Sequence, residues 1–264
     1  MKILSLILPL AMIGSLSAVS ATDSLGDLRA VAASFDCSFF RAPQKNADPV
    51  TLETVLKKMD EVAANFHSIQ ATFEWDTYLK VINEVDEVET GTVYYRRSGK
   101  SVEMMADADK SGSSVASLKP ERKYVLLSNG VIRMYQPKPD QLTVYDLGKN
   151  RSDFESYIVL GFGGSGQDLQ KEFDVTYLGP ETVNGVATAK LQLIPKSAKV
   201  RNTYSRMLLW IDVSRGISVQ QQFFEPEGDY RLAKYSDIQI NQKIPDKVFK
   251  LNTTSKTQTI SPRG

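Results

Sequence analysis

The sequence predicts a mainly β protein of the α+β class, in which helices close one curved antiparallel sheet of about ten or eleven strands. Apolar and polar residues alternate with period two in many segments, as in strands that bury one face. Turn signals separate these segments, the clearest being Asn129-Gly130, so strands that are neighbours in sequence are expected to pair as a meander. One amphipathic helix precedes all of these strands.

Residues 1–21 have the pattern of a secretory signal peptide. Lys2 precedes an apolar run from Ile3 to Ile13, and Val19-Ser20-Ala21 supplies the small residues of a cleavage site after Ala21. The apolar run is too short to span a bilayer. We therefore expect the mature protein outside the cytoplasm, where no ATP pool drives chemistry, and this excludes many enzyme classes.

Charge and rare residues exclude further functions. The chain has 32 Lys and Arg against 31 Asp and Glu and no basic run, so nucleic acid is not an expected partner. Cys37, the single cysteine, cannot form an internal disulfide, and an inert thiol is favoured over a lipid anchor. His67 is the single histidine and has no partner motif nearby. We expect neither a cofactor, a metal nor a catalytic residue.

The first helix follows a mixed extension. Residues 22–47 end in a linker-like stretch, so we expect this extension to be poorly ordered. Asp48 and Pro49 then open a helix that reaches Phe66, with Asp48 as its expected N-cap. Its apolar residues recur at steps of three and four, so one stripe of this helix has to cover an apolar surface.

The meander is expected to begin directly after this helix. Serine, glycine and charged residues predict a mobile loop at 108–119. Strands are expected at 69–79, 89–97, 101–107, 124–128, 131–136, 141–147, 173–179, 186–195, 206–213, 216–225 and 230–240.

A helical segment interrupts this meander after residue 147. Ser152-Asp153-Phe154-Glu155 is a capping box, and Phe154, Tyr157, Ile158 and Leu160 follow on one helical side. The glycine-rich run 161–166 then breaks the helix. We expect a lid over the sheet, hinged by these glycines. A phosphate-binding loop is disfavoured because the run lacks Gly-Lys-Ser/Thr.

Short motifs in a fixed order carry a family resemblance. They are Ile69-Gln70-Ala71-Thr72-Phe73, Gly91-Thr92-Val93-Tyr94-Tyr95-Arg96-Arg97, Leu126-Leu127-Ser128-Asn129-Gly130, Met134-Tyr135-Gln136-Pro137, Leu193-Ile194-Pro195-Lys196, Leu209-Trp210-Ile211-Asp212 and Lys247-Val248-Phe249-Lys250-Leu251. With them, the chain resembles the LolA-like outer-membrane lipoprotein carriers of the LolA/LolB superfamily. The resemblance implies a half-open β-barrel, closed by helices, with an apolar cavity that holds acyl chains.

The resemblance also implies which residues form the site. An arginine at the Arg97 position would latch the lid, although Arg96 competes by a one-residue shift, and Ser98 stands where the family has proline. The lid would carry Phe154, Tyr157, Ile158 and Leu160. The acyl-chain cavity would be lined by Ile69, Ala71, Phe73, Trp75, Val93, Tyr95, Tyr135 and Leu209.

The expected protein is a monomeric periplasmic carrier that moves lipoprotein acyl chains from the inner to the outer membrane. The family implies an inner-membrane ABC-type release complex as donor and an outer-membrane receptor as acceptor. The expected segments are a signal peptide (1–21), an extension (22–47), a carrier domain (48–252) and a tail (253–264). The alternatives are an envelope lipid or lipoprotein sensor, a glycolipid-binding protein on the same fold, and an enzyme that uses acidic residues, although no carboxylate pair stands out.

Overall fold

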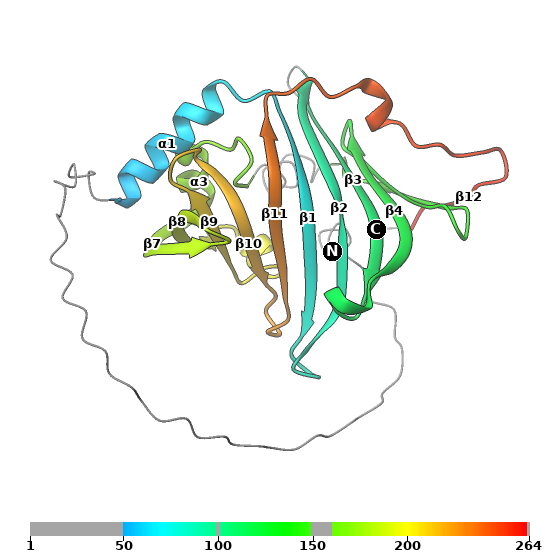
Figure 1. The fold of residues 1–264 in the computed structure, drawn as a ribbon, viewed down its shortest axis with the longest axis horizontal. Coiled ribbons are helices and arrows are strands. Elements are labelled where there is room, and N and C mark those ends of the chain that lie inside the picture. Colours follow the sequence, from blue (N-terminus) through cyan, green and yellow to red (C-terminus); the bar gives the residue numbers. More distant parts are fainter. Residues whose placement is uncertain (1–49, 99–100, 149–159, 263–264) are drawn as a thin grey trace, which may run out of the picture. The chain divides into compact units, whose positions relative to one another are not determined.

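One curved sheet of twelve strands organises the protein in this computed structural model, which describes residues 50–98, 101–148 and 160–262 (Figure 1). Its order is β12-β6-β5-β4-β3-β2-β1-β11-β10-β9-β8-β7. All neighbours pair antiparallel except β12 and β6. The strands are β1 (Ser68–Leu79), β2 (Glu84–Ser98), β3 (Ser101–Gly112), β4 (Lys119–Ser128), β5 (Val131–Gln136), β6 (Gln141–Asp146), β7 (Phe173–Val183), β8 (Val186–Pro195), β9 (Arg206–Asp212), β10 (Ile217–Phe224), β11 (Tyr230–Ile240) and β12 (Gln258–Ile260).

The predicted fold class is confirmed. Strands β3 and β4 are longer than the expected strands at 101–107 and 124–128, and this difference has a physical cause. The stretch 108–119, expected to be a mobile loop, instead completes β3, forms the short 3-10 helix η2 (Val115–Ser117) and opens β4. β2 is 15 residues long, so its far half needs a partner for its backbone hydrogen bonds. β3 supplies that partner, with Ala108 opposite Gly91 and Lys110 opposite Thr90.

The first helix, α1 (Leu52–Ala64), starts later than Asp48 and Pro49 indicate. Thr51 is its N-cap: the Thr51 hydroxyl accepts from the Thr54 N–H, and the Thr54 hydroxyl accepts from the Thr51 N–H. This reciprocal pair satisfies two of the free donors at the helix start, which corrects the expected cap at Asp48. Asp48 itself lies outside the described residues.

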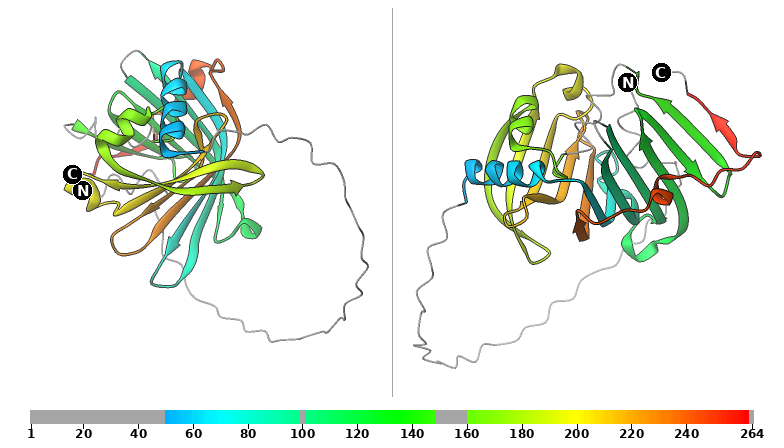
Figure 2. Two further views of the ribbon diagram at one scale, coloured as in Figure 1. Left: turned by 90° about the vertical axis from the view of Figure 1, so that its left-hand side faces the viewer. Right: turned by 90° about the horizontal axis from the view of Figure 1, so that it is seen from above.

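Two helices pack on one face of the sheet at its β7–β9 end, and we call this face the inner face (Figure 2). Val55, Leu56 and Met59 of α1 pack with Leu169 of α3 (Gly166–Glu172) and with β8 and β9 residues such as Leu209. A second inner-face cluster continues along β1 to β6 and contains Phe73, Val93 and Leu127. Helix positions at three- and four-residue spacing thus meet strand positions at two-residue spacing, as the sequence patterns require.

On the opposite face, the outer face, the chain that follows β11 packs on β3 and β4. Phe249 of the 3-10 helix η4 (Asp246–Phe249) and Ile244 pack on Met105 and Leu126, which point away from the inner face. β12 forms inside the expected tail, where the Gln258 N–H donates to the Asp140 carbonyl at 2.9 Å. The short helix α4 (Ala198–Arg201) joins β8 to β9.

Candidate functional site

The inner face gathers most of the residues that were predicted to line an acyl-chain cavity. Ile69, Ala71, Phe73 and Trp75 of β1 alternate onto it and are at most 5% exposed. The Phe73 and Trp75 rings stack with centroids 3.9 Å apart. Val93 and Tyr95 of β2 belong to the same cluster. The period-two pattern therefore brings these six residues together on one side of neighbouring strands.

Leu209 lies on the same face, further along the sheet. It pairs across the strands with Gln221, which pairs with Ala233, which pairs with Trp75. Directly opposed residues in antiparallel strands point to the same side, so Leu209 shares the inner face with Trp75. Leu209 packs in the cluster beneath α1, whereas Trp75 belongs to the neighbouring cluster.

Tyr135 is not brought together with the others. Its ring lies parallel to that of Tyr124 with centroids 6.3 Å apart, and its hydroxyl donates to Asp140 at 3.1 Å. Tyr124 packs with the outer-face cluster around Met105, whereas Ile132 and Met134 are the β5 residues of the inner-face cluster. Alternation along β5 thus places Tyr135 on the side opposite to the other predicted residues.

Of the predicted lid residues only Leu160 is described, since Phe154, Tyr157 and Ile158 lie outside the described residues. Leu160 opens the loop Leu160–Gly163, whose glycines belong to the predicted hinge. Two hydrogen bonds hold this loop against β10. The Gln221 Nε2 donates to the Leu160 carbonyl at 2.6 Å, and the Ser218 N–H donates to the Gly161 carbonyl at 2.8 Å. Phe162 then places its ring edge-on to Tyr235, with centroids 4.6 Å apart. The loop therefore joins the inner-face core.

Arg97, and not Arg96, contacts this loop. The Arg97 guanidinium donates to the Gly163 carbonyl at 2.8 Å and lies 5.9 Å from the centre of the Phe66 ring. Arg96 points to the outer face, where it pairs with Glu103 at 2.8 Å and stacks over Phe249. Strand alternation separates the two arginines, because consecutive side chains leave a strand on opposite sides.

The glycines of the loop permit close packing in this conformation. Gly161 and Gly163 have φ of +75° and +77°, a region that L side chains rarely adopt. A Cβ at Gly163 would lie 2.4 Å from the Phe66 ring, and a Cβ at Gly161 would lie 2.3 Å from Ser218. Because neither glycine has a side chain, the loop can lie close to Phe66, which follows α1, and to Ser218 of β10.

A charged group at one end of the inner face was missed by the sequence analysis. Glu89 lies opposite Trp75, and Glu87 lies opposite Thr77, so both carboxylates point to the inner side. Glu89 forms an ion pair with Lys123. Burial, and then the charge of Glu89, raise the pKa of Glu87 to about 7. The sequence could have shown this, because both glutamates lie an even number of positions before Val93 and Tyr95 and therefore fall on the same face of β2.

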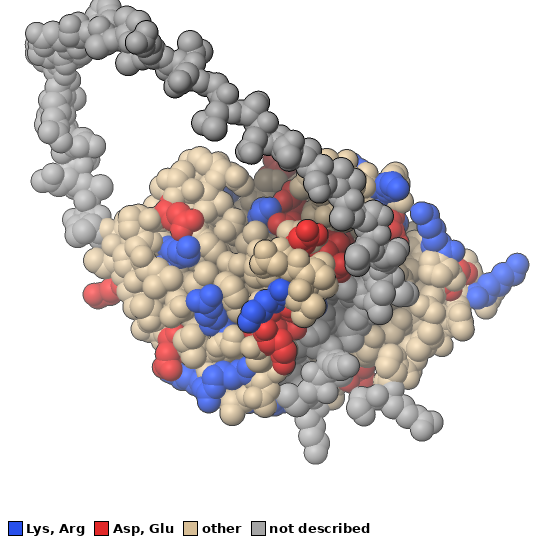
Figure 3. Space-filling model, turned by 90° about the horizontal axis from the view of Figure 1, so that it is seen from below, with Lys and Arg blue, Asp and Glu red and all other residues tan. Residues whose placement is uncertain are grey.

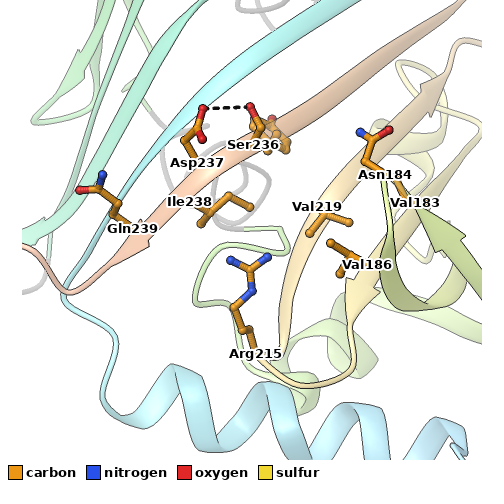
Figure 4. A pocket seen from close by; sticks show the side chains of 10 residues that line it. Val183, Asn184, Val186, Arg215, Val219, Ser236, Asp237, Ile238 and Gln239 are labelled. Atoms are coloured by element: carbon orange, nitrogen blue, oxygen red, sulfur yellow. Dashed lines mark hydrogen bonds between the residues drawn. The ribbon is translucent and has the colours of Figure 1, made fainter.

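A separate pocket of about 510 Å³ opens on the outer face. β10 and β11 pair only from Gln220 to Phe224, so the rest of the two strands diverge. Figure 4 shows Arg215 extending toward Val219 and Ile238 in this space. Arg215 already donates to Asp212 at 2.6 Å, and no predicted site residue lines the pocket.

His67 is exposed, and its backbone N–H donates to the Asn241 side chain at 2.8 Å. Across the described ranges, no group of three or more His, Cys, Asp or Glu side chains is placed to hold a metal ion. Nor does any helix in them have the length and apolar character needed to cross a membrane. On the face drawn in Figure 3, positive and negative side chains are interspersed.

Fold and site together define a curved open β-sheet with an apolar inner face that helices and a pinned loop cover. No family model matches the sequence, and no curated protein matches it. The chain is similar to an uncharacterized conserved protein from Thermus thermophilus, with 11% identity, a TM-score of 0.48, and coverage of 80% of this chain and 98% of that one.

Two further solved structures are similar in fold. One is a LolA superfamily protein from Nitrosomonas europaea, with 15% identity, a TM-score of 0.37, and coverage of 77% of this chain and 99% of that one. The other is the MucA/MucB complex of Pseudomonas aeruginosa, with 13% identity, a TM-score of 0.43, and coverage of 75% of this chain and 60% of that one.

Proposed function

We propose that this protein is a periplasmic carrier that shelters the acyl chains of a lipoprotein against its inner face and moves them from the inner to the outer membrane. The observation that carries the proposal is the apolar inner face, which runs from β6 through β1 to β11 and on to the strands under α1. A covering loop, Leu160–Gly163, is pinned there by a few hydrogen bonds.

The energetics suit reversible binding. Each methylene withdrawn from water contributes about 0.8 kcal/mol, so one chain of about 15 methylenes contributes on the order of 12 kcal/mol. The hydrogen bonds from Arg97, Ser218 and Gln221 to the loop each contribute about 1 kcal/mol net. A membrane interior withdraws the same methylenes from water, so the exchange of a chain between membrane and inner face is nearly balanced, and the loop's hydrogen bonds favour the covered state after release.

The proposed route needs a donor and an acceptor. An inner-membrane ABC-type complex would release the lipoprotein to this protein, and an outer-membrane receptor would take it over. Neither step requires a nucleophile, a metal or a cofactor from this protein, because moving hydrocarbon between apolar surfaces breaks no covalent bond of the cargo. We propose that the protein acts as a monomer after cleavage behind Ala21.

A transfer assay tests the proposal. Purified mature protein is added to inner-membrane vesicles that carry a labelled lipoprotein and are supplied with ATP for the release complex. The label released into the soluble fraction is measured, followed by its delivery to outer-membrane vesicles. A carrier releases and delivers the label. A lipid sensor or a glycolipid-binding protein would leave the lipoprotein in the donor vesicles, and that result would overturn the proposal.

A matched pair of variants locates the binding surface. Ala71 and Thr72 are neighbours in β1, with Ala71 buried on the inner face and Thr72 exposed on the outer one. Ala71→Phe should fill the inner face and abolish release, whereas Thr72→Phe should leave it intact. Thermal unfolding of both variants shows whether either has lost its fold. Equal release by the two folded variants would count against the inner face as the binding surface.

A further inference from the structure

Two carboxylates lie side by side on the inner face, at the end away from Arg97. Glu87 and Glu89 are two residues apart on β2 and therefore point to the same side. Glu89 is 3% exposed. Its cross-strand neighbour is Trp75, which belongs to the apolar cluster proposed to receive acyl chains. We call Glu87 and Glu89 the carboxylate pair.

One cation faces this pair across the sheet. Lys123 of β4 lies opposite Ala108, which lies opposite Gly91, so all three positions share the inner face. The small residues between them leave room for Lys123 to reach Glu89. A Cβ on Gly91 would lie 2.1 Å from the Asp107 carbonyl oxygen, so this position cannot accept a larger residue without a shift of the backbone.

The carboxylate pair carries more negative charge than its neighbouring cation neutralises, and some of its oxygens receive no hydrogen bond. Two carboxylates face one ammonium, Lys123, which pairs with Glu89 alone. The second oxygen of each carboxylate, Oε2, is buried and has no hydrogen-bond partner among the described residues, and the same holds for the Thr77 hydroxyl. A buried acceptor without a donor costs about 1–3 kcal/mol, and more when it is charged. These three atoms are thus arranged to receive donors from a ligand.

We propose that the carboxylate pair binds a primary ammonium group that the cargo carries next to its acyl chains. This inference rests on the proposed lipid-carrying function. An ammonium has three N–H donors, which match the two free carboxylate oxygens and the Thr77 hydroxyl. Residues two apart on a strand are separated by about 6.5–7 Å, so one nitrogen fits between their carboxylates at ordinary charged hydrogen-bond lengths.

The surrounding charges favour a cation over an anion at this position. Burial raises the pKa of Glu87 most, and the charges of Glu89, Asp86 and Glu121 raise it further. Among the described residues, Lys123 is the one charge that lowers it. A bound ammonium would reverse the balance by stabilising the ionised form of Glu87. The ammonium has two chemical sources, the free α-amino group of a diacylated lipoprotein and the headgroup of an aminolipid, and the experiment separates them.

The test uses two pairs of ligands, and in each pair only one member carries an ammonium group. A synthetic S-diacylglyceryl-cysteine peptide is prepared with a free α-amino group and with an N-acetyl group, and the dissociation constants of both for the mature protein are measured at pH 7.5. In a second arm, phosphatidylethanolamine and phosphatidylglycerol vesicles are compared by native mass spectrometry of the extracted lipid. We expect the ammonium-bearing member of at least one pair to bind about tenfold more tightly.

Variants assign that preference to the carboxylate pair. Glu87→Gln removes one charge from a side chain whose buried oxygen has no partner, so the fold should persist. This substitution should reduce the preference for the ammonium-bearing ligand severalfold. A triple variant that combines Glu87→Gln, Glu89→Gln and Lys123→Met should abolish the preference. Glu181→Gln is the matched control, because Glu181 is an exposed carboxylate on the edge strand β7 and is not among the charges that act on Glu87.

The outcomes separate this inference from the function on which it rests. Preference in the peptide arm alone assigns the α-amino group, and preference in the vesicle arm alone assigns the aminolipid headgroup. If the wild-type protein binds both members of each pair equally well, the carboxylate pair has no role in recognition, and only this inference fails. If no acylated ligand binds at all, the proposed carrier function fails as well.

Discussion

Removal of the Arg97 guanidinium should loosen the Leu160–Gly163 loop without unfolding the sheet. The guanidinium donates one hydrogen bond of 2.8 Å to the Gly163 carbonyl. A hydrogen bond to a charged group contributes about 1.5–3 kcal/mol, and the exposure of Arg97 to solvent reduces this to about 1–1.5 kcal/mol. The free energy of local opening should fall by that amount, which corresponds to a roughly tenfold larger open population.

Hydrogen exchange at Ser218 measures this opening directly. The Ser218 N–H donates to the Gly161 carbonyl, so it exchanges with solvent when the loop leaves β10. Arg97→Leu should speed this exchange about fivefold to tenfold, while amides of the central strands β1 and β2 keep their protection. Arg96→Leu is the control, because Arg96 pairs with Glu103 on the outer face. Unchanged exchange in Arg97→Leu, or an equal effect of Arg96→Leu, would refute the latch.

Two further predictions concern the loop glycine and the buried carboxylate. Gly163→Ala should lower the free energy of unfolding by about 2–3 kcal/mol, since the new methyl group meets the Phe66 ring at a φ of +77°. Gly185→Ala has a similar φ of +79° in open space and should cost only about 1 kcal/mol, so equal losses in denaturant titrations would contradict the packing argument. Burial raises the native pKa of Glu87 to about 7, so the native state retains a proton that the unfolded state has released above about pH 4.5. Stability should therefore fall as the pH rises from about 5 to 8, and a parallel fall in Glu87→Gln would show that another group causes it.

The elements that the sequence predicts well are those encoded by consecutive residues. The apolar steps of α1 and the alternation in β1 identify a helix and a strand before any neighbour is known, because each pattern matches the geometry of its own backbone. The same alternation placed Ile69, Ala71, Phe73 and Trp75 on one face, and the structure has them there. The length of β3 was underestimated, because its polar second half is held by β2 rather than by its own composition.

Positions that depend on a single step of register required the tertiary structure. Tyr135 and Met134 are adjacent, as are Arg96 and Arg97, and a shift of one residue exchanges the faces of each pair. The structure places Arg97 beside the Gly163 carbonyl, 66 positions away in sequence, and Tyr135 on the outer face. The sequence alone determined a curved sheet with one apolar side, since local periodicity is written in neighbouring residues. Only the tertiary structure decided which side chains meet across that sheet, because strand register depends on hydrogen bonds between segments far apart in the chain.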